Sequence, residues 1–196
     1  YEIAQCLVGS EMCIRDSVTL VGILDADMSL HFSDYRSGER TFQLVTQVSG
    51  RSGRAEEKGK VVLQTYDPEN YILRFAVNYD YEGFFRHEIS VRKSTAFPPF
   101  AKIVRVMVVG EEEKKALEVL KGVYFSLREV FETHREDFLF FNKMKSPVKR
   151  IQNKFRYQVL MRLSNERLLP EIYTRALQYK TRDVNVYVEE NPANMS

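Results

Sequence analysis

The chain of 196 residues is 44% hydrophobic and 29% charged, and its formal net charge is +2. This is the composition of a globular protein with one or two domains, so a nucleic-acid-binding surface would have to be a local patch. No apolar run is long enough to cross a bilayer, and the two cysteines are too few for a structural zinc site or a disulfide framework. We therefore expect a cytoplasmic protein that binds no metal by itself.

Residues 1–17 do not follow the pattern of the rest of the chain. They lack helical or strand periodicity, and they lack the basic start and apolar centre of a signal peptide. The stretch resembles the translated adapter sequence that occurs at the ends of some fragmentary protein sequences. We therefore expect a non-native tail here, the alternative being an irregular N-terminal extension.

The next segments predict an α/β crossover unit. The nearly continuous apolar run at 18–24 is typical of a strand buried on both faces of a parallel sheet, and residues 60–66 predict a second strand. Residues 39–54 between them are predicted to be helical, and the pattern from 68 to 93 is helical again. Asp27 follows the first strand, at the end where α/β sheets bind ligands, and it either assists a metal or caps the strand.

The most distinctive motif ends the first predicted helix, where the residues from Gln47 to Arg54 read Q-x-x-G-R-x-G-R. On a helix, Gln47, Arg51 and Arg54 would share one cationic face. Gly50 and Gly53 each cost about 1 kcal/mol relative to alanine inside a helix, so another group should approach the backbone there. Because arginine forks bind phosphoryl oxygens bidentately, the octet predicts a phosphate-rich ligand. The alternative is a solvated turn without a partner.

Paired prolines at 98 and 99 cannot continue a helix, so we place a domain boundary there, with domains at 18–97 and 98–196. The second domain is predicted to follow the order βαββαβ. Its elements are a strand at 103–109, a helix at 111–131, strands at 138–143 and 155–163, a helix at 166–179 and a strand at 184–189. This order predicts a ferredoxin-like fold, in which two helices cover one face of an antiparallel sheet.

The two middle strands of this domain predict a basic hairpin, because no acidic residue lies between Asp137 and Glu166. Alternate side chains from Phe155 to Leu163 should face the core and leave Arg156 on the opposite side. We expect a mobile tip whose cations contact a nucleic-acid backbone: Lys149, Arg150, Lys154 and Arg156. The alternative is a solvated basic loop. Base stacking is not expected, since no aromatic residue lies on the presumed outer face of the second strand.

Several segments together resemble one protein family. The octet looks like motif VI of superfamily 2 helicases. The other similar segments are Leu24-Asp25-Ala26-Asp27, Asp34 to Leu44, Gly59 to Tyr66, Pro98-Pro99 and the βαββαβ domain with Ser146-Pro147. From Val18 to its end, the chain closely resembles the primosomal replication-restart helicases of the PriA (primosomal protein N-prime) family.

The resemblance implies that residues 18–97 end the second RecA-like helicase lobe and that residues 98–196 form a DNA-binding domain. Arg54 would be the arginine finger for ATP and Mg²⁺ bound to a first lobe, with Arg51 as a second phosphate contact and Gln47 coupling nucleotide to DNA. Such fingers contribute about 10³–10⁵ in rate. Because the chain contains no P-loop, we do not expect it to hydrolyse ATP alone.

The function implied is that of an ATP-dependent DNA helicase that recognises forked DNA and restarts replication by primosome assembly. The implied partners are forked or single-stranded DNA, primosome proteins and single-stranded DNA-binding protein. Zinc is expected only in a cysteine-rich insertion outside this chain. The alternative function is that of a non-catalytic nucleic-acid-binding module.

Overall fold

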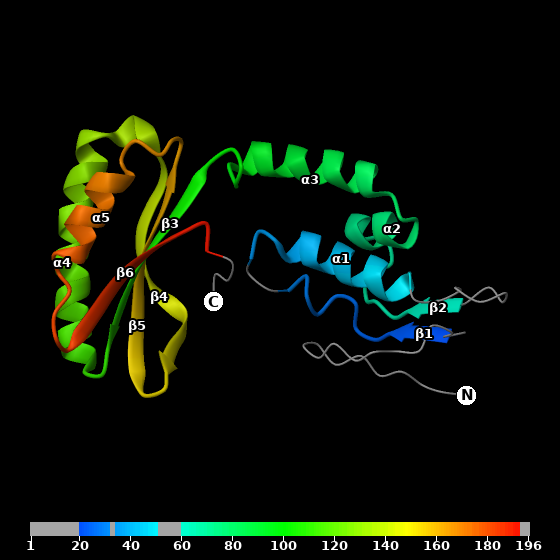
Figure 1. The fold of residues 1–196 in the computed structure, drawn as a ribbon, viewed down its shortest axis with the longest axis horizontal. Helices are drawn as coiled ribbons and strands as arrows, with labels where there is room; N and C mark the ends of the chain where they lie inside the picture. Colours follow the sequence, from blue (N-terminus) through cyan, green and yellow to red (C-terminus); the bar gives the residue numbers. More distant parts are fainter. Residues whose placement is uncertain (1–19, 32–33, 51–59, 193–196) are drawn as a thin grey trace. The chain divides into compact units, whose positions relative to one another are not determined.

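In the computed structural model, the residues described are 20–31, 34–50 and 60–192, without the side chains of 147–149. The expected tail at 1–17 lies outside these ranges. Contacts divide the chain into two units, one up to Ile89 and one from Ser90 onward, so helix α3 (Tyr81–Thr95) belongs to both (Figure 1). The domain boundary predicted at the proline pair lies beyond the end of this helix. Among the described residues, no helix is both long and apolar enough to cross a membrane.

Unit 1 contains the predicted parallel strand pair. Strand β1 (Leu20–Ile23) pairs in parallel with β2 (Lys60–Leu63), and Val21 is the register partner of Val61. The expectation that both faces of the first strand are buried is wrong for the described residues, since Leu20 is 56% exposed. Alternate side chains of the two strands face outward, where no described element packs against them.

Helix α1 (Ser37–Ser49) is shorter than predicted, because it ends at the first glycine of the octet. Gly50 is its C-cap residue, and its N–H donates to the Thr46 carbonyl at 2.9 Å. Arg51, Gly53 and Arg54 lie outside the described residues. The predicted helical face of Gln47, Arg51 and Arg54 is thus described only at Gln47, and the placement of its two arginines stays a prediction.

The helical stretch predicted from 68 to 93 is two helices, α2 (Tyr71–Val77) and α3. A break separates them because Tyr79 adopts a positive φ of 54°, which an α-helix does not accommodate. The Asp80 carboxylate then accepts a hydrogen bond from the Gly83 N–H at 2.8 Å, which satisfies a backbone donor in the first turn of α3.

Aromatic stacking and one close approach pack α1 against these two helices. The ring of Phe42 stacks on that of Phe84 with centroids 4.4 Å apart. A β-carbon at Gly38 would lie 3.0 Å from the Ile72 side chain, so the absent side chain lets α2 come close. Both aromatic residues are buried, and with Val45 they belong to the apolar core of unit 1.

Unit 2 has the predicted βαββαβ order. Its elements are β3 (Lys102–Gly110), α4 (Glu113–Thr133), a short 3-10 helix η1 (Arg135–Asp137), β4 (Phe138–Ile151), β5 (Lys154–Leu163), α5 (Leu169–Leu177) and β6 (Val184–Glu190). The four strands form one antiparallel sheet in the order β4-β5-β3-β6. Both helices cover the same face of this sheet (Figure 1), which confirms the ferredoxin-like fold.

The core of unit 2 lies between the sheet and its two helices. Each strand contributes alternate side chains, as the period of a strand requires, and α4 and α5 contribute Leu127 and Ile172, which are completely buried. The alternation predicted for β5 is confirmed, since Val159, Met161 and Leu163 belong to this core. The strands of this unit are therefore held by a continuous apolar layer.

The segment that follows α3 is fastened to the sheet by Arg162 of β5. Its Nη1 donates to the Thr95 carbonyl at 2.9 Å, and its guanidinium lies 4.6 Å from the centroid of the Phe97 ring. Arg92 adds a hydrogen bond from its Nη1 to the carbonyl of Pro98. Within unit 2, the end of α3 and the proline pair are thus held by two arginines.

Replacing Leu127 with alanine should destabilise unit 2 by about 2–5 kcal/mol, because the change leaves a cavity in a completely buried site. Phe125, two positions away on α4, is 56% exposed, and Phe125→Ala is the matched control with a much smaller expected effect. Urea unfolding followed by circular dichroism measures both. Equal losses for the two variants would contradict this description of the core.

Candidate nucleotide and nucleic-acid sites

Two of the residues predicted to bind a nucleotide, Gln47 and Gly50, lie at the C-terminal end of α1. Gln47 is exposed on the last turn, and Gly50 follows the helix. A β-carbon at Gly50 would contact only carbonyl oxygens of α1 itself, the nearest at 3.3 Å. The close approach predicted at this glycine is therefore not made by any described residue. The roles of Arg51, Gly53 and Arg54 stay predictions.

Asp27 is buried behind β1, where it joins the ends of the two parallel strands. Its Oδ1 accepts from the Thr65 hydroxyl and its Oδ2 from the Tyr66 N–H, both at 2.7 Å. These bonds, that of Thr65 first, lower the pKa of Asp27 below its ordinary value. The geometry is that of a strand-end cap, one of the two alternatives drawn from the sequence. A role in cofactor binding stays a prediction.

The loop before α1 is anchored by Asp34, which sequence reasoning did not single out as a site residue. The side chain of Asp34 is buried, accepts from the Arg36 N–H at 3.0 Å and forms an ion pair with Arg40 at 2.9 Å. The hydroxyls of Ser29 and Thr41 lie 2.7 Å apart and make a second link. These contacts hold the loop that follows β1 against the start of α1. The sequence signal for this anchor was the segment from Asp34 to Leu44, which is part of the family resemblance.

The basic hairpin is formed by β4 and β5, and its tip is more regular than predicted. After a register shift between Lys145 and Arg150, the strand ladder resumes and ends at the pair Ile151 and Lys154. Only Gln152 and Asn153 connect them, with positive φ values of 49° and 63°. Such a pair of φ values is typical of a two-residue type I′ turn, whose twist matches that of the flanking strands. The expected tip from 149 to 154 therefore contains a tight two-residue turn, and its mobility stays a prediction.

The predicted cations of the hairpin have different surroundings. Arg150 is exposed, and its guanidinium lies 5.1 Å from the centroid of the Phe155 ring. The Lys154 side chain is 51% exposed, with its ammonium 4.0 Å from a carboxylate oxygen of Glu111. Arg156 is half-buried, and the side chain of Lys149 lies outside the described atoms. Arg150 and Lys154 are thus the best-placed cations among those described.

The sheet face opposite the helices is a poor surface for nucleic acid. Arg105 and Met107 on β3 and Gln158 on β5 are all buried on this face. Arg105 also forms an ion pair with Glu189 of β6 at 2.7 Å, so its charge is compensated. Contact with a polyanion is therefore expected at the turn end of the sheet and not across its middle.

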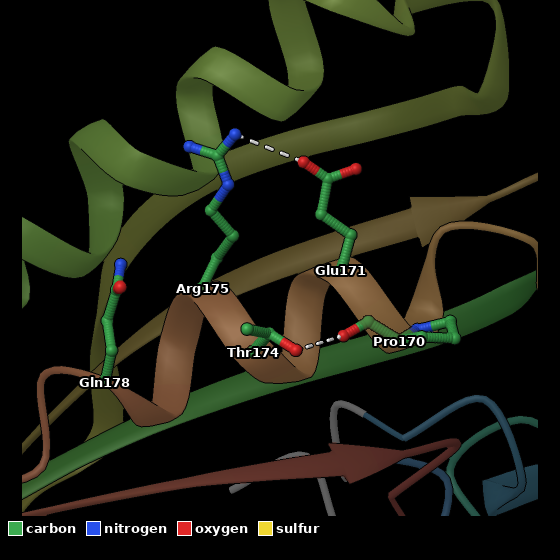
Figure 2. Close-up of a pocket in the computed structure, with 5 residues that line it drawn as sticks. All are labelled: Pro170, Glu171, Thr174, Arg175 and Gln178. Carbon is green, nitrogen blue, oxygen red and sulfur yellow. Dashed lines mark hydrogen bonds and ion pairs between the residues drawn. The ribbon is translucent and has the colours of Figure 1, made fainter.

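A hollow along α5 does not provide an anion site either (Figure 2). It is lined by Pro170, Glu171, Thr174, Arg175 and Gln178. The cation of Arg175 forms ion pairs with Glu129 at 2.7 Å and with Glu171 at 3.2 Å. The bond to Glu129, first among the causes, raises the pKa of Arg175 further. The pair with Glu129 connects α5 to α4, and the pair with Glu171 lies within α5, so the arginine is a packing element.

The residues His134, Glu136 and Asp137 bring potential metal ligands within 4.8 Å of one another. However, Asp137 already accepts hydrogen bonds from Asn165 at 2.7 Å and from the Nε of Arg167 at 2.9 Å. The arginine lowers the pKa of the Asp137 carboxyl. These bonds tie η1 to the turn before α5, which gives the carboxylate a structural role.

Comparisons with known proteins point to one family. The family model described as "Primosomal protein N C-terminal domain" matches residues 93–193. A replication restart protein PriA of Bacillus subtilis is 34% identical over 98% of this chain and 25% of that protein. The proteins of the same name from Rickettsia felis and Synechocystis are 35% and 32% identical over 79% and 81% of this chain, and 24% and 19% of their own lengths. The chain thus spans a quarter or less of these relatives.

The strand-end cap at Asp27 predicts a pH-dependent loss of stability. A carboxyl whose pKa is lowered by folding stabilises the protein above its unfolded value near 3.8 and loses this contribution as the pH falls through the lower folded value. Asp27→Asn should therefore melt below wild type at neutral pH, and the difference should shrink below about pH 4. Thermal melts across pH 2–7 measure this, with the exposed neighbour Asp25→Asn as control. A difference independent of pH would contradict the assignment.

Proposed function

Because this chain belongs to the primosomal protein N (PriA) family, we propose that it forms the C-terminal part of an ATP-dependent DNA helicase that restarts replication at forked DNA. The observation that carries this proposal is the octet from Gln47 to Arg54, whose paired arginines suit a phosphate-rich ligand. The family's C-terminal domain, matched over residues 93–193, supports it independently.

The nucleotide-dependent part of the proposal assigns half of an ATP site to unit 1. Arg54 acts as the arginine finger and Arg51 as a second phosphate contact, while the P-loop and the Mg²⁺ ligands come from a first helicase lobe. Helix α1 is well anchored for this task, since Asp34 and Phe42 tie it to the loop before it and to α3. ATP turnover then depends on closure of the two lobes, because neither half is sufficient.

The DNA-dependent part assigns phosphate contacts to the β4–β5 hairpin. Exposed Arg150 and Lys154 lie on the two sides of the turn, and the chain from Asp137 to Glu166 adds no acidic residue between them. Glu111 is the nearest described counter-charge of Lys154 and opposes binding of a polyanion. On the basis of the family, the proposed protein partners are primosome proteins and single-stranded DNA-binding protein.

A second candidate function is that of a nucleic-acid-binding module without catalysis. It is favoured by unit 2, whose four-stranded sheet, two helices and basic hairpin form a complete layer structure. It leaves the arginine pair of the octet without a role. The two candidates differ in whether ATP hydrolysis by the complete protein needs Arg54.

In the complete protein, Arg54→Ala should reduce DNA-stimulated ATP hydrolysis by about 10³-fold or more, because an arginine finger acts mainly on the transition state. ATP affinity should change little. Steady-state hydrolysis and binding of a fluorescent ATP analogue measure the two effects, with Arg74→Ala as the control, since Arg74 is exposed and paired only with Glu69 among the contacts described. Unchanged turnover in Arg54→Ala would refute the helicase proposal.

The charges of the hairpin should set the salt dependence of DNA binding. Replacing Arg150 and Lys154 together with alanine should lower the slope of log affinity against log salt by about 0.9 for each phosphate that is no longer neutralised. Glu111→Gln should act in the opposite direction and raise affinity, because it removes a repulsive charge beside Lys154. Fluorescence anisotropy on forked DNA at several salt concentrations measures the affinity of wild type, of the double variant and of Glu111→Gln. Arg128→Ala, an exposed cation of α4, is the control.

A further inference from the structure

The β4–β5 turn carries an apolar side chain at its tip. Ile151 is the last residue of β4, and it is 44% exposed. It is directly followed by the two turn residues, so only Gln152 and Asn153 lie beyond it on the hairpin. An isolated exposed isoleucine is ordinary on a protein surface. The position of Ile151 beside the turn, and not its exposure alone, therefore carries the inference.

The strand register shows which residues accompany Ile151. Ile151 and Lys154 are direct cross-strand partners, so their side chains lie on the same face of the hairpin. Arg150 and Phe155 form the next pair and lie on the opposite face. The apolar tip therefore has a cation beside it on its own face and another cation on the reverse face.

The turn that follows Ile151 is tight. A two-residue turn with both central residues at positive φ continues the twist of the strands without a loop. The cation–π contact between Arg150 and Phe155, at 5.1 Å, adds an interaction across the last full strand pair. Ile151 thus lies at a paired strand end, directly before a tight turn.

A nucleic acid whose phosphates contact both cations would bring its bases to the apolar side chain beside them. Apolar side chains of this kind, isoleucine included, insert at base steps or cover an unstacked base pair in complexes with duplex DNA. A single strand supplies only one line of phosphates, whereas the end of a duplex at a fork supplies two strands that diverge around the tip.

We propose that Ile151 is a wedge that packs on the terminal base pair of a duplex where its two strands separate, while Arg150 and Lys154 hold the phosphates of the diverging strands. This deepens the proposed function and rests on it, since it identifies the junction of forked DNA as the substrate element that the hairpin recognises. The positive charge of the tip is complementary to DNA. This complementarity favours DNA over an apolar protein surface as the partner.

The experiment uses the complete protein without ATP and a forked DNA with 2-aminopurine in the base pair at the junction. Wild type should raise the fluorescence of this base on binding, because contact with Ile151 weakens its stacking. Ile151→Ser should lose most of the rise and lower the preference for forked over single-stranded DNA by about tenfold, since the apolar base contact is gone. Its salt slope should equal that of wild type, because both cations are retained.

Two further variants make the outcome specific to an apolar tip. Ile151→Leu should keep the fluorescence rise, and Leu177→Ser, at a similarly exposed apolar position on α5, should behave as wild type. A rise of equal size in wild type and Ile151→Ser, with normal salt-dependent binding, would overturn the wedge and leave the proposed DNA contact intact. If wild type does not bind forked DNA at low salt, the proposed DNA-binding function of the hairpin is refuted, and the wedge with it.

Discussion

The sheet centred on β3 is the constraint on which the arrangement of unit 2 depends. β3 is hydrogen-bonded to β5 on one side and to β6 on the other, so its valines at 104, 106 and 108 all face the same way and are completely buried. Such a face needs a covering layer, which α4 and α5 provide. Once the register of β5 against β3 is set, the end of the sheet at which the hairpin turns is set as well.

Cations that are paired with carboxylates have structural roles, whereas cations without such close pairing can bind a polyanion. Arg105, Arg167 and Arg175 each face a carboxylate at hydrogen-bond distance. Their role is to connect strands, turns and helices. Arg150 and Lys154, in contrast, lie at the turn, where the first contacts a ring and the second approaches Glu111 only to 4.0 Å. Location in the fold, more than total charge, therefore decides which cations remain available.

Unit 1 shows a similar division between support and function. The described residues before the octet are largely engaged in holding α1, through Asp34, Arg40 and Phe42. Asp27 joins the ends of the two parallel strands. In the sequence, the octet overlaps the last turn of this anchored helix at Gln47, and its two arginines follow Gly50.

Sequence alone predicted the order of the elements of unit 2, the parallel strand pair of unit 1 and the cationic character of the hairpin, because each depends on local periodicity and charge. It did not predict the end of α1 at Ser49 or the break at Tyr79, since both depend on backbone conformations that apolar spacing does not reveal. The tight turn at Gln152 and Asn153 was equally hidden, because neither residue is a glycine.

The family resemblance also came from sequence, since motif residues are local to one segment. Only the tertiary structure decided which residues of the hairpin share a face, because that depends on hydrogen-bond register between two strands. It brought Glu111 close to Lys154 and placed Ile151 on the same face as that lysine. It also buried Gln158 and Arg105, two polar residues that their sequence neighbours alone would leave in solvent. Burial and pairing are properties of strands brought together, which a single strand cannot specify.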